Sequence, residues 1–294
     1  MATREEWMGV RCLFESPILD ERKWAKVPTI EADAFILDLE DSVPLARKEE
    51  AREKVVEFLG RPEYFNGAKI IPRANHLDTP WGRDDLAALA EAGADVIMYP
   101  KTHSPDDVDA VTEVLAEHGS NAKLLVCIES ARGVIEVERT FAKEQVVAAA
   151  FGSGDLHVDA DFPLYVDDGE MNPTLLYSKR RCALAGAAFG LPVLTMVYTL
   201  DIKDLVLFEA RLRDEKAIGF TGAASFYPPQ VPLVNEVFSP SEADVAKAHE
   251  IIEIYELAVE NGNPAVQLQS GEALLVHHYK EALALIERAS GTTK

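Results

Sequence analysis

The sequence predicts an α/β fold, a TIM (β/α)8 barrel with extra C-terminal helices, and three observations support this prediction. Eight short apolar runs alternate along the chain with segments of helical pattern. The runs are mostly continuous, as is typical of parallel strands that are buried on both faces. Several helical segments end in glycine just before the next run, as in EAGADVIMY and AFGLPVLTM. The alternative is a doubly wound open sheet, but eight strands with intervening helices favour the barrel.

The elements follow one another in a regular order. We expect strands at residues 10–14, 34–39, 69–72, 95–99, 123–128, 146–151, 193–198 and 220–226. Helices are expected between them, at residues 45–59, 83–92, 105–118, 134–143, 175–189 and 205–218. Residues 1–235 would then form the catalytic barrel. Two further helices, at 240–260 and 271–289, follow the last strand, so we expect residues 236–294 to form a helical extension at a subunit interface.

The composition limits the possible classes of function. The chain has 294 residues, of which 48% are hydrophobic, enough for one large domain with a substantial core. A net charge of −21 argues against binding to nucleic acid or to an anionic membrane surface, because both need clustered lysine and arginine. Three widely spaced cysteines, no CxxC pair and no long apolar stretch predict a soluble, cytoplasmic protein.

Acidic residues gather where the predicted strands end. In a TIM barrel, functional groups lie at the carboxyl ends of the strands. Unpaired carboxylates are seldom fully buried, and a hard cation such as Mg²⁺ prefers oxygen ligands and keeps several waters. The pattern therefore predicts a magnesium site at one mouth of the barrel, formed among Asp38, Glu40, Asp41, Glu129 and Asp155.

Basic residues accompany these acids. Arg73 offers a planar guanidinium for a substrate carboxylate or carbonyl, and a salt bridge to Asp38 or Glu40 is the structural alternative. Lys101, at the fourth strand end, is a second candidate for substrate binding. Arg11, early in the first strand, is a third. Any one of these charges could be a helix cap or a surface residue, but together they favour a functional site.

The chain resembles the citrate lyase beta subunit-like group of the HpcH/HpaI aldolase superfamily, which includes malyl-CoA and citramalyl-CoA lyases. The matching segments run nearly end to end: RCLFES from residue 11, LEDSVP at 39–44, KEEAR at 48–52, PRAN at 72–75, YPKT at 99–102, CIESARGV at 127–134, FGSGDL at 151–156, and GFTG with YPPQVPLVNEVFSP from residue 219 on.

The resemblance implies specific roles for residues of this chain. Glu129 and Asp155 would bind Mg²⁺, and Arg73 would orient the substrate. Glu40 and Asp41 would bind metal-bound water or support the ligands, so that Arg73, Glu40 and Asp41 are the expected catalytic residues. The resemblance also implies homo-oligomers, commonly trimers or hexamers, and a Mg²⁺-dependent carbon–carbon lyase or aldolase that cleaves or forms a small-molecule substrate, a β-hydroxyacyl-CoA.

Four positions depart from the family pattern. Tyr227 stands where the family usually has histidine, and Thr195 stands where aspartate is common. Leu275 stands where the family has an aspartate after a G-x-M-(V/I) motif, and Ala223 stands where a basic residue is often found. Because these changes affect the expected CoA and acid/base positions, two alternatives stay open. The first is a CoA-independent aldolase acting on a 2-keto or hydroxy acid. The second is a non-catalytic barrel that binds a metabolite.

Overall fold

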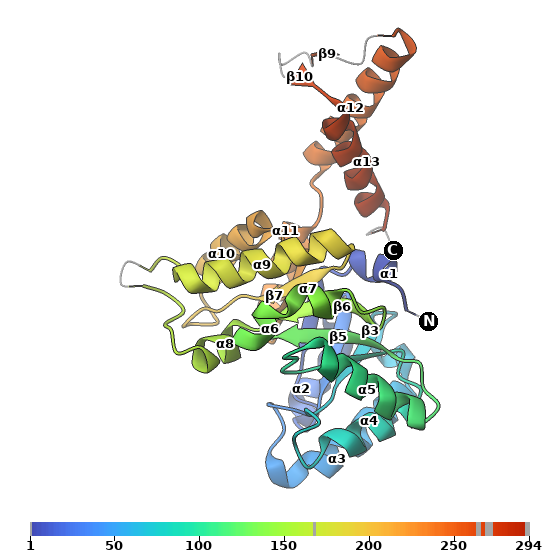
Figure 1. Cartoon of the computed structure of the whole chain (residues 1–294), viewed down its shortest axis with the longest axis vertical. Coiled ribbons are helices and arrows are strands. Elements are labelled where there is room, and N and C mark those ends of the chain that lie inside the picture. Colours follow the sequence, from blue (N-terminus) through green and yellow to red (C-terminus); the bar gives the residue numbers. More distant parts are fainter. Residues whose placement is uncertain (1, 167–168, 263–265, 268–272, 292–294) are drawn as a thin grey trace. The chain divides into compact units, whose positions relative to one another are not determined.

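The computed structural model describes residues 2–166, 169–262, 266–267 and 273–291 (Figure 1). It contains two compact units, residues 1–235 and 236–294. The first unit is a closed barrel of parallel strands that follow one another in chain order, with β8 paired to β1. The predicted TIM barrel with additional C-terminal helices is therefore confirmed.

The barrel strands are short and almost wholly buried. They are β1 Cys12–Glu15, β2 Ala34–Asp38, β3 Lys69–Arg73, β4 Val96–Tyr99, β5 Lys123–Ile128, β6 Val146–Phe151, β7 Val193–Met196 and β8 Gly222–Ser225. Helices cover their outer face, which explains why the runs are continuously apolar instead of alternating. The predicted boundaries are close to the observed ones, and the largest shifts occur at the first strand and the last two.

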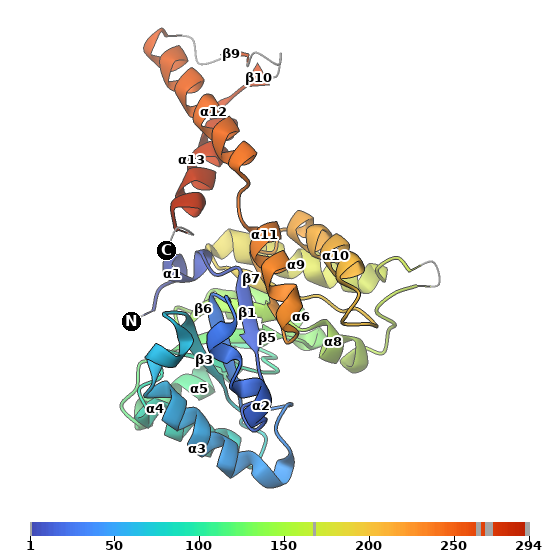
Figure 2. The ribbon, with the colours of Figure 1, turned by 180° about the vertical axis from the view of Figure 1, so that it is seen from behind.

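Five of the expected helices surround the barrel, as the two opposite views show (Figures 1 and 2). They are α3 Lys48–Leu59, α4 Gly82–Glu91, α5 Pro105–Glu117, α9 Pro173–Phe189 and α10 Leu205–Ile218. The helix expected at 134–143 is instead two short helices, α6 Ala131–Ile135 and α7 Val137–Phe141. The short helices α1 Arg4–Met8, α2 Glu21–Trp24, α8 Ser153–Asp159 and α11 Val231–Phe238 were not expected, because such brief segments carry little periodicity.

Helix α1 closes the amino end of the barrel. Its Trp7 is 1% exposed and belongs to the hydrophobic core inside the strands. Arg4, in the same helix, donates hydrogen bonds of 2.7 to 3.0 Å to backbone carbonyls of segments far along the chain, namely Val146, Phe189, Phe141 and Lys143. Helix α1 therefore joins the end of α7, the start of β6 and the end of α9 through the Arg4 side chain.

Arg11 also lies at this amino end, directly before β1. Its backbone N–H donates to Asp33 Oδ2 at 2.7 Å, and its guanidinium bonds to the same carboxylate at 2.8 and 3.0 Å. Asp33 directly precedes β2, so this ion pair joins the starts of two neighbouring strands. The structure thus places Arg11 at the opposite end of the barrel from the predicted site, which corrects its assignment as a substrate-binding residue.

The second unit contains a pair of helices and a small two-stranded sheet. Helix α12 Glu242–Glu260 packs against α13 Val276–Gly291, and Tyr255 stacks on Tyr279 with ring centroids 4.7 Å apart. The strands β9 Val266–Gln267 and β10 Ala273–Leu274 form a small ladder. The helix expected at 271–289 begins later because of this pairing, and residues 271 and 272 lie outside the described residues. No helix in the described part of the chain has the length and apolarity needed to cross a membrane.

Candidate active site

Ionisable side chains meet at the carboxyl ends of the strands. Glu15, Asp38 and Arg73 are the last residues of β1, β2 and β3. Arg73 Nε lies 2.5 Å from Asp38 Oδ1 and 3.5 Å from Glu40 Oε2, and Nη2 lies 3.3 Å from Glu15 Oε2. Burial opposes the charge of Arg73, but the surrounding carboxylates outweigh this effect and raise its pKa. The salt bridge considered for Arg73 is therefore present, and the side chain is a firmly charged guanidinium at the mouth.

Asp38 anchors the loop that follows β2. Its Oδ1 accepts the N–H of Glu40 at 2.9 Å, and its Oδ2 accepts the N–H of Ser42 at 2.8 Å. Burial raises the pKa of Asp38, but Arg73 and these backbone donors reverse the effect and leave it lowered. Because both oxygens are engaged, Asp38 acts as an ionised support for the loop and is not free to bind a metal.

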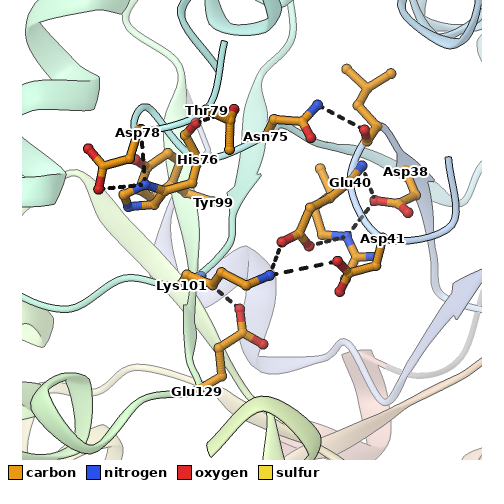
Figure 3. Close-up of polar contacts among 12 residues, drawn as sticks. Asp38, Glu40, Asp41, Asn75, His76, Asp78, Thr79, Tyr99, Lys101 and Glu129 are labelled. Atoms are coloured by element: carbon orange, nitrogen blue, oxygen red, sulfur yellow. Dashed lines mark hydrogen bonds and ion pairs between the residues drawn. The ribbon is translucent and has the colours of Figure 1, made fainter. Parts of the chain in front are cut away.

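Lys101 joins three carboxylates that follow two different strands (Figure 3). Its ammonium bonds to Glu40 Oε1 and lies 3.7 Å from Asp41 Oδ1, while its backbone N–H donates to Glu129 Oε1 at 2.7 Å. The backbone of Lys101 has φ 48°, in the left-handed region that residues with a Cβ rarely adopt. Such strain is concentrated at functional sites, and here it directs the N–H of Lys101 to Glu129 and its side chain to Glu40 and Asp41.

Lys48 holds the loop that carries Glu40. Its ammonium, in a residue only 5% exposed, donates to the carbonyls of Leu39 and Glu40, both at 2.7 Å, and to Asn75 Oδ1 at 2.8 Å. Asn75 in turn donates to Asp85 Oδ2 at 2.6 Å. Sequence reasoning missed Lys48, because a lysine at the start of an amphipathic helix has the pattern of a surface residue. Every ammonium proton is used, so this lysine fixes the loop and is not a reactive group.

Glu129 and Asp155 follow β5 and β6, as predicted, and lie near one another. Burial, with repulsion from Glu40 and Asp155, raises the pKa of Glu129 to about 7. A Cβ atom on Gly152 would lie 2.4 Å from Glu129 Oε2 and 2.6 Å from Glu129 Cβ, so a glycine is needed there for Glu129 to hold its position. Among the described residues, no lysine or arginine side chain forms a salt bridge with Glu129 or Asp155.

This pair of carboxylates fits a hard divalent cation. The two acids lie close together, no described lysine or arginine forms a salt bridge with either, and a cation would relieve the repulsion that contributes to the raised pKa of Glu129. Within the described ranges, no three His, Cys, Asp or Glu side chains form a ready metal-binding group. A bound ion would therefore take its remaining ligands from water or substrate, which is the usual situation for Mg²⁺.

A cavity of ≈ 450 Å³ adjoins the cluster at the carboxyl ends of β1 and β8. Glu15 lines it together with Lys23, Lys26 and apolar side chains, among them Phe226. A second cavity of ≈ 490 Å³ shares Lys26 and Tyr227 with the first. Glu15 thus belongs both to the cavity and to the charged cluster. Sequence reasoning missed it, although the rule that singled out other acids at strand ends applies to it equally.

The four departures from the family pattern occupy different environments. Thr195 is buried on the helix side of the barrel wall, where its hydroxyl lies 3.2 Å from Glu215 Oε2, so it does not face the mouth. Ala223 is buried within β8. Leu275 is exposed in the second unit, and Tyr227 lines both cavities.

The chain is similar to proteins that are already known. The family model described as HpcH/HpaI aldolase/citrate lyase matches residues 16–228, well over half of the chain. A (3S)-malyl-CoA thioesterase of Cereibacter sphaeroides is 32% identical, covering 86% of this chain and 85% of that protein. Citrate lyase subunit beta of Escherichia coli is also 32% identical, covering 81% and 79%. The crystal structure of CitE from Mycobacterium tuberculosis with magnesium, acetoacetate and coenzyme A has a TM-score of 0.78 at 25% identity, covering 96% and 99%.

Proposed function

The chain belongs to the HpcH/HpaI aldolase/citrate lyase family, and we propose that it is a Mg²⁺-dependent carbon–carbon lyase that cleaves or forms a β-hydroxyacyl-CoA. One observation carries the proposal: Glu129 and Asp155, which form no salt bridge with a lysine or arginine in the described part of the chain, stand at neighbouring strand ends in the same cluster as the buried Arg73. The relatives named citrate lyase subunit beta, and the CitE structure that contains magnesium and coenzyme A, support this assignment.

The residues of the cluster would have different roles in this reaction. Glu129 and Asp155 would bind Mg²⁺, which when bound supplies positive charge for the substrate oxygens on which negative charge develops. Arg73 orients the carboxylate or carbonyl of the fragment that carries no CoA, because its planar fork suits those groups. Glu40 and Asp41 bind water at the site. Lys101 holds Glu40 and Glu129 in place and also lies beside the substrate.

The two cavities would accommodate the coenzyme A part of the substrate. Coenzyme A has a long arm with phosphate groups, and Lys23 and Lys26 would bring positive charge to them while the apolar walls contact the arm. This local charge offsets the acidic character of the chain as a whole. The arm would then approach the cluster beside Glu15, the residue that the cavity and the cluster share.

The test is turnover of malyl-CoA with Mg²⁺, in which glyoxylate and free CoA thiol are measured side by side. Lyase activity yields glyoxylate, detected as its phenylhydrazone, and acetyl-CoA, with no free thiol. The relatives named (3S)-malyl-CoA thioesterase favour a second candidate, hydrolysis of the thioester, which releases malate and a free CoA thiol. Turnover of a free 2-keto acid with an aldehyde, without any reaction of the ester, would instead support a CoA-independent aldolase. No turnover with either would leave a metabolite-binding barrel.

The second unit is proposed to lie at a subunit interface in a homotrimer or homohexamer. Its described residues include several exposed apolar side chains, Leu257, Val259, Leu275, Val276 and Leu283. Removal of residues 265–294, which include α13, should lower the molar mass measured by light scattering. An unchanged oligomer would show that this unit does not hold the subunits together.

A further inference from the structure

Glu15 stands between the charged cluster and the adjoining cavity. It is the last residue of β1, its side chain is 15% exposed, and it lines the cavity of ≈ 450 Å³. Its ion-pair partner is Arg73, whose Nη2 lies 3.3 Å from Glu15 Oε2. Within the described part of the chain its carboxylate accepts no hydrogen bond. A substrate entering from the cavity would therefore meet Glu15 beside the arginine that orients it.

The other carboxylates of the cluster have different surroundings or proposed roles. Both oxygens of Asp38 accept hydrogen bonds, and Glu40 is bonded to Lys101. Glu129 and Asp155 are the proposed metal ligands, and the Asp41 side chain is 62% exposed. Glu15 is thus a half-buried acid of the cluster that lines the cavity and retains accepting capacity toward it.

We propose that Glu15 is the catalytic residue that transfers the proton during carbon–carbon cleavage, a role that rests on the proposed lyase function. The Glu15 carboxylate removes the proton from the β-hydroxyl group of the substrate. The bond between the hydroxyl-bearing carbon and the carbon α to the thioester then breaks. Its electron pair passes to the thioester fragment as an enolate, while the hydroxyl carbon becomes the carbonyl of the oxoacid. Glu15 returns the proton to the enolate carbon, so no further reactant is needed.

The electrostatic surroundings suit this exchange. Burial, together with repulsion from Asp38, Glu40 and Asp41, raises the pKa of Glu15 to about 7 against the opposing effect of Arg73 from β3. Lys23 and Lys26, from α2 and the segment after it, are the basic residues on the cavity side. A carboxyl group with a pKa near the working pH both accepts and returns a proton readily.

The test compares Glu15→Gln with Asp33→Asn, which removes the acid from an arginine–carboxylate pair at the opposite end of the barrel. In Glu15→Gln, kcat for malyl-CoA should fall by about 100-fold or more, within the range for loss of acid–base catalysis. The rise of wild-type activity centred near pH 7 should disappear, while Mg²⁺ affinity by calorimetry stays the same. Glu15→Asp should keep the pH-dependent rise at reduced rate, and Asp33→Asn should match wild-type kcat.

Two results would overturn the proposal while the lyase function stands. One is Glu15→Gln with a kcat near that of the wild type. The other is a raised KM with kcat and pH profile unchanged, because Glu15 would then only orient Arg73. If the wild type cleaves no ester, the lyase function fails and proton transfer is tested alone, by exchange of acetyl-CoA methyl protons with D2O. Exchange that Glu15→Gln abolishes supports the role of Glu15, whereas exchange that is absent from the wild type or survives in the variant refutes it.

Discussion

The two ends of the barrel use the same kinds of side chain in opposite ways. At the amino end, Arg4 donates to backbone carbonyls and Arg11 is paired with the carboxylate of Asp33. At the carboxyl end, Arg73 is surrounded by carboxylates, and Glu129 has a raised pKa and no basic partner among the described residues. Charges that the protein itself satisfies contribute to stability, whereas charges left in excess provide binding energy for a ligand.

The largest effect is expected when both proposed metal ligands are removed. The double variant Glu129→Ala with Asp155→Ala should bind no Mg²⁺ in calorimetry and should lose all Mg²⁺-dependent turnover. Asp33→Ala, which deletes a carboxylate from the amino end, should bind Mg²⁺ as the wild type does. Wild-type Mg²⁺ binding by the double variant would show that the site is assigned to the wrong residues.

Arg73→Lys should lower kcat/KM by about 100-fold, because an ammonium cannot reproduce the planar fork that pairs with a carboxylate. The matched change Arg11→Lys should leave kcat/KM within about twofold of the wild type, because the Arg11–Asp33 pair lies at the other end of the barrel from the reacting groups. Steady-state kinetics on both variants tests the contrast. Equal losses would mean that the two arginines do not differ in role.

Gly152→Ala should weaken Mg²⁺ binding by about tenfold, roughly 1.4 kcal/mol, because the added methyl group would displace Glu129. Gly154→Ala is the control, since a Cβ there would meet no atom within 4 Å and its backbone is not in the left-handed region. Titration calorimetry of both variants measures the difference. Equal Mg²⁺ affinities would show that Glu129 tolerates displacement or is not a ligand.

The smallest effect on activity is expected from Arg4→Met at the amino end. The loss of its hydrogen bonds to the carbonyls of β6, α7 and α9 should lower the free energy of unfolding by about 2 kcal/mol. Urea denaturation measures that change, and kcat/KM at 25 °C should stay at the wild-type level. A large fall in kcat/KM with unchanged stability would contradict the view that the amino end serves stability and the carboxyl end serves catalysis.

Much of the barrel could be predicted because buried parallel strands leave continuous apolar runs. The acids after β5 and β6 were found because each follows such a run. Arg11 was misplaced because a residue at or just before the start of a parallel strand lies at the amino end of the barrel, whereas the site forms at the carboxyl ends of the strands. Lys48 could not have been found, since its partners are carbonyls of a loop whose path has no sequence signature.

The closing pair of strands has a consequence for how the chain folds during synthesis. β1 pairs with β8 through Cys12 and Ala223, and Arg4 bonds to the carbonyl of Phe189. The first strand to leave the ribosome therefore keeps one edge unpaired until the last strand has emerged. Contacts of such long sequence separation slow folding, and an open edge invites pairing with other chains. Slower translation past residue 225 would give this barrel time to close before release.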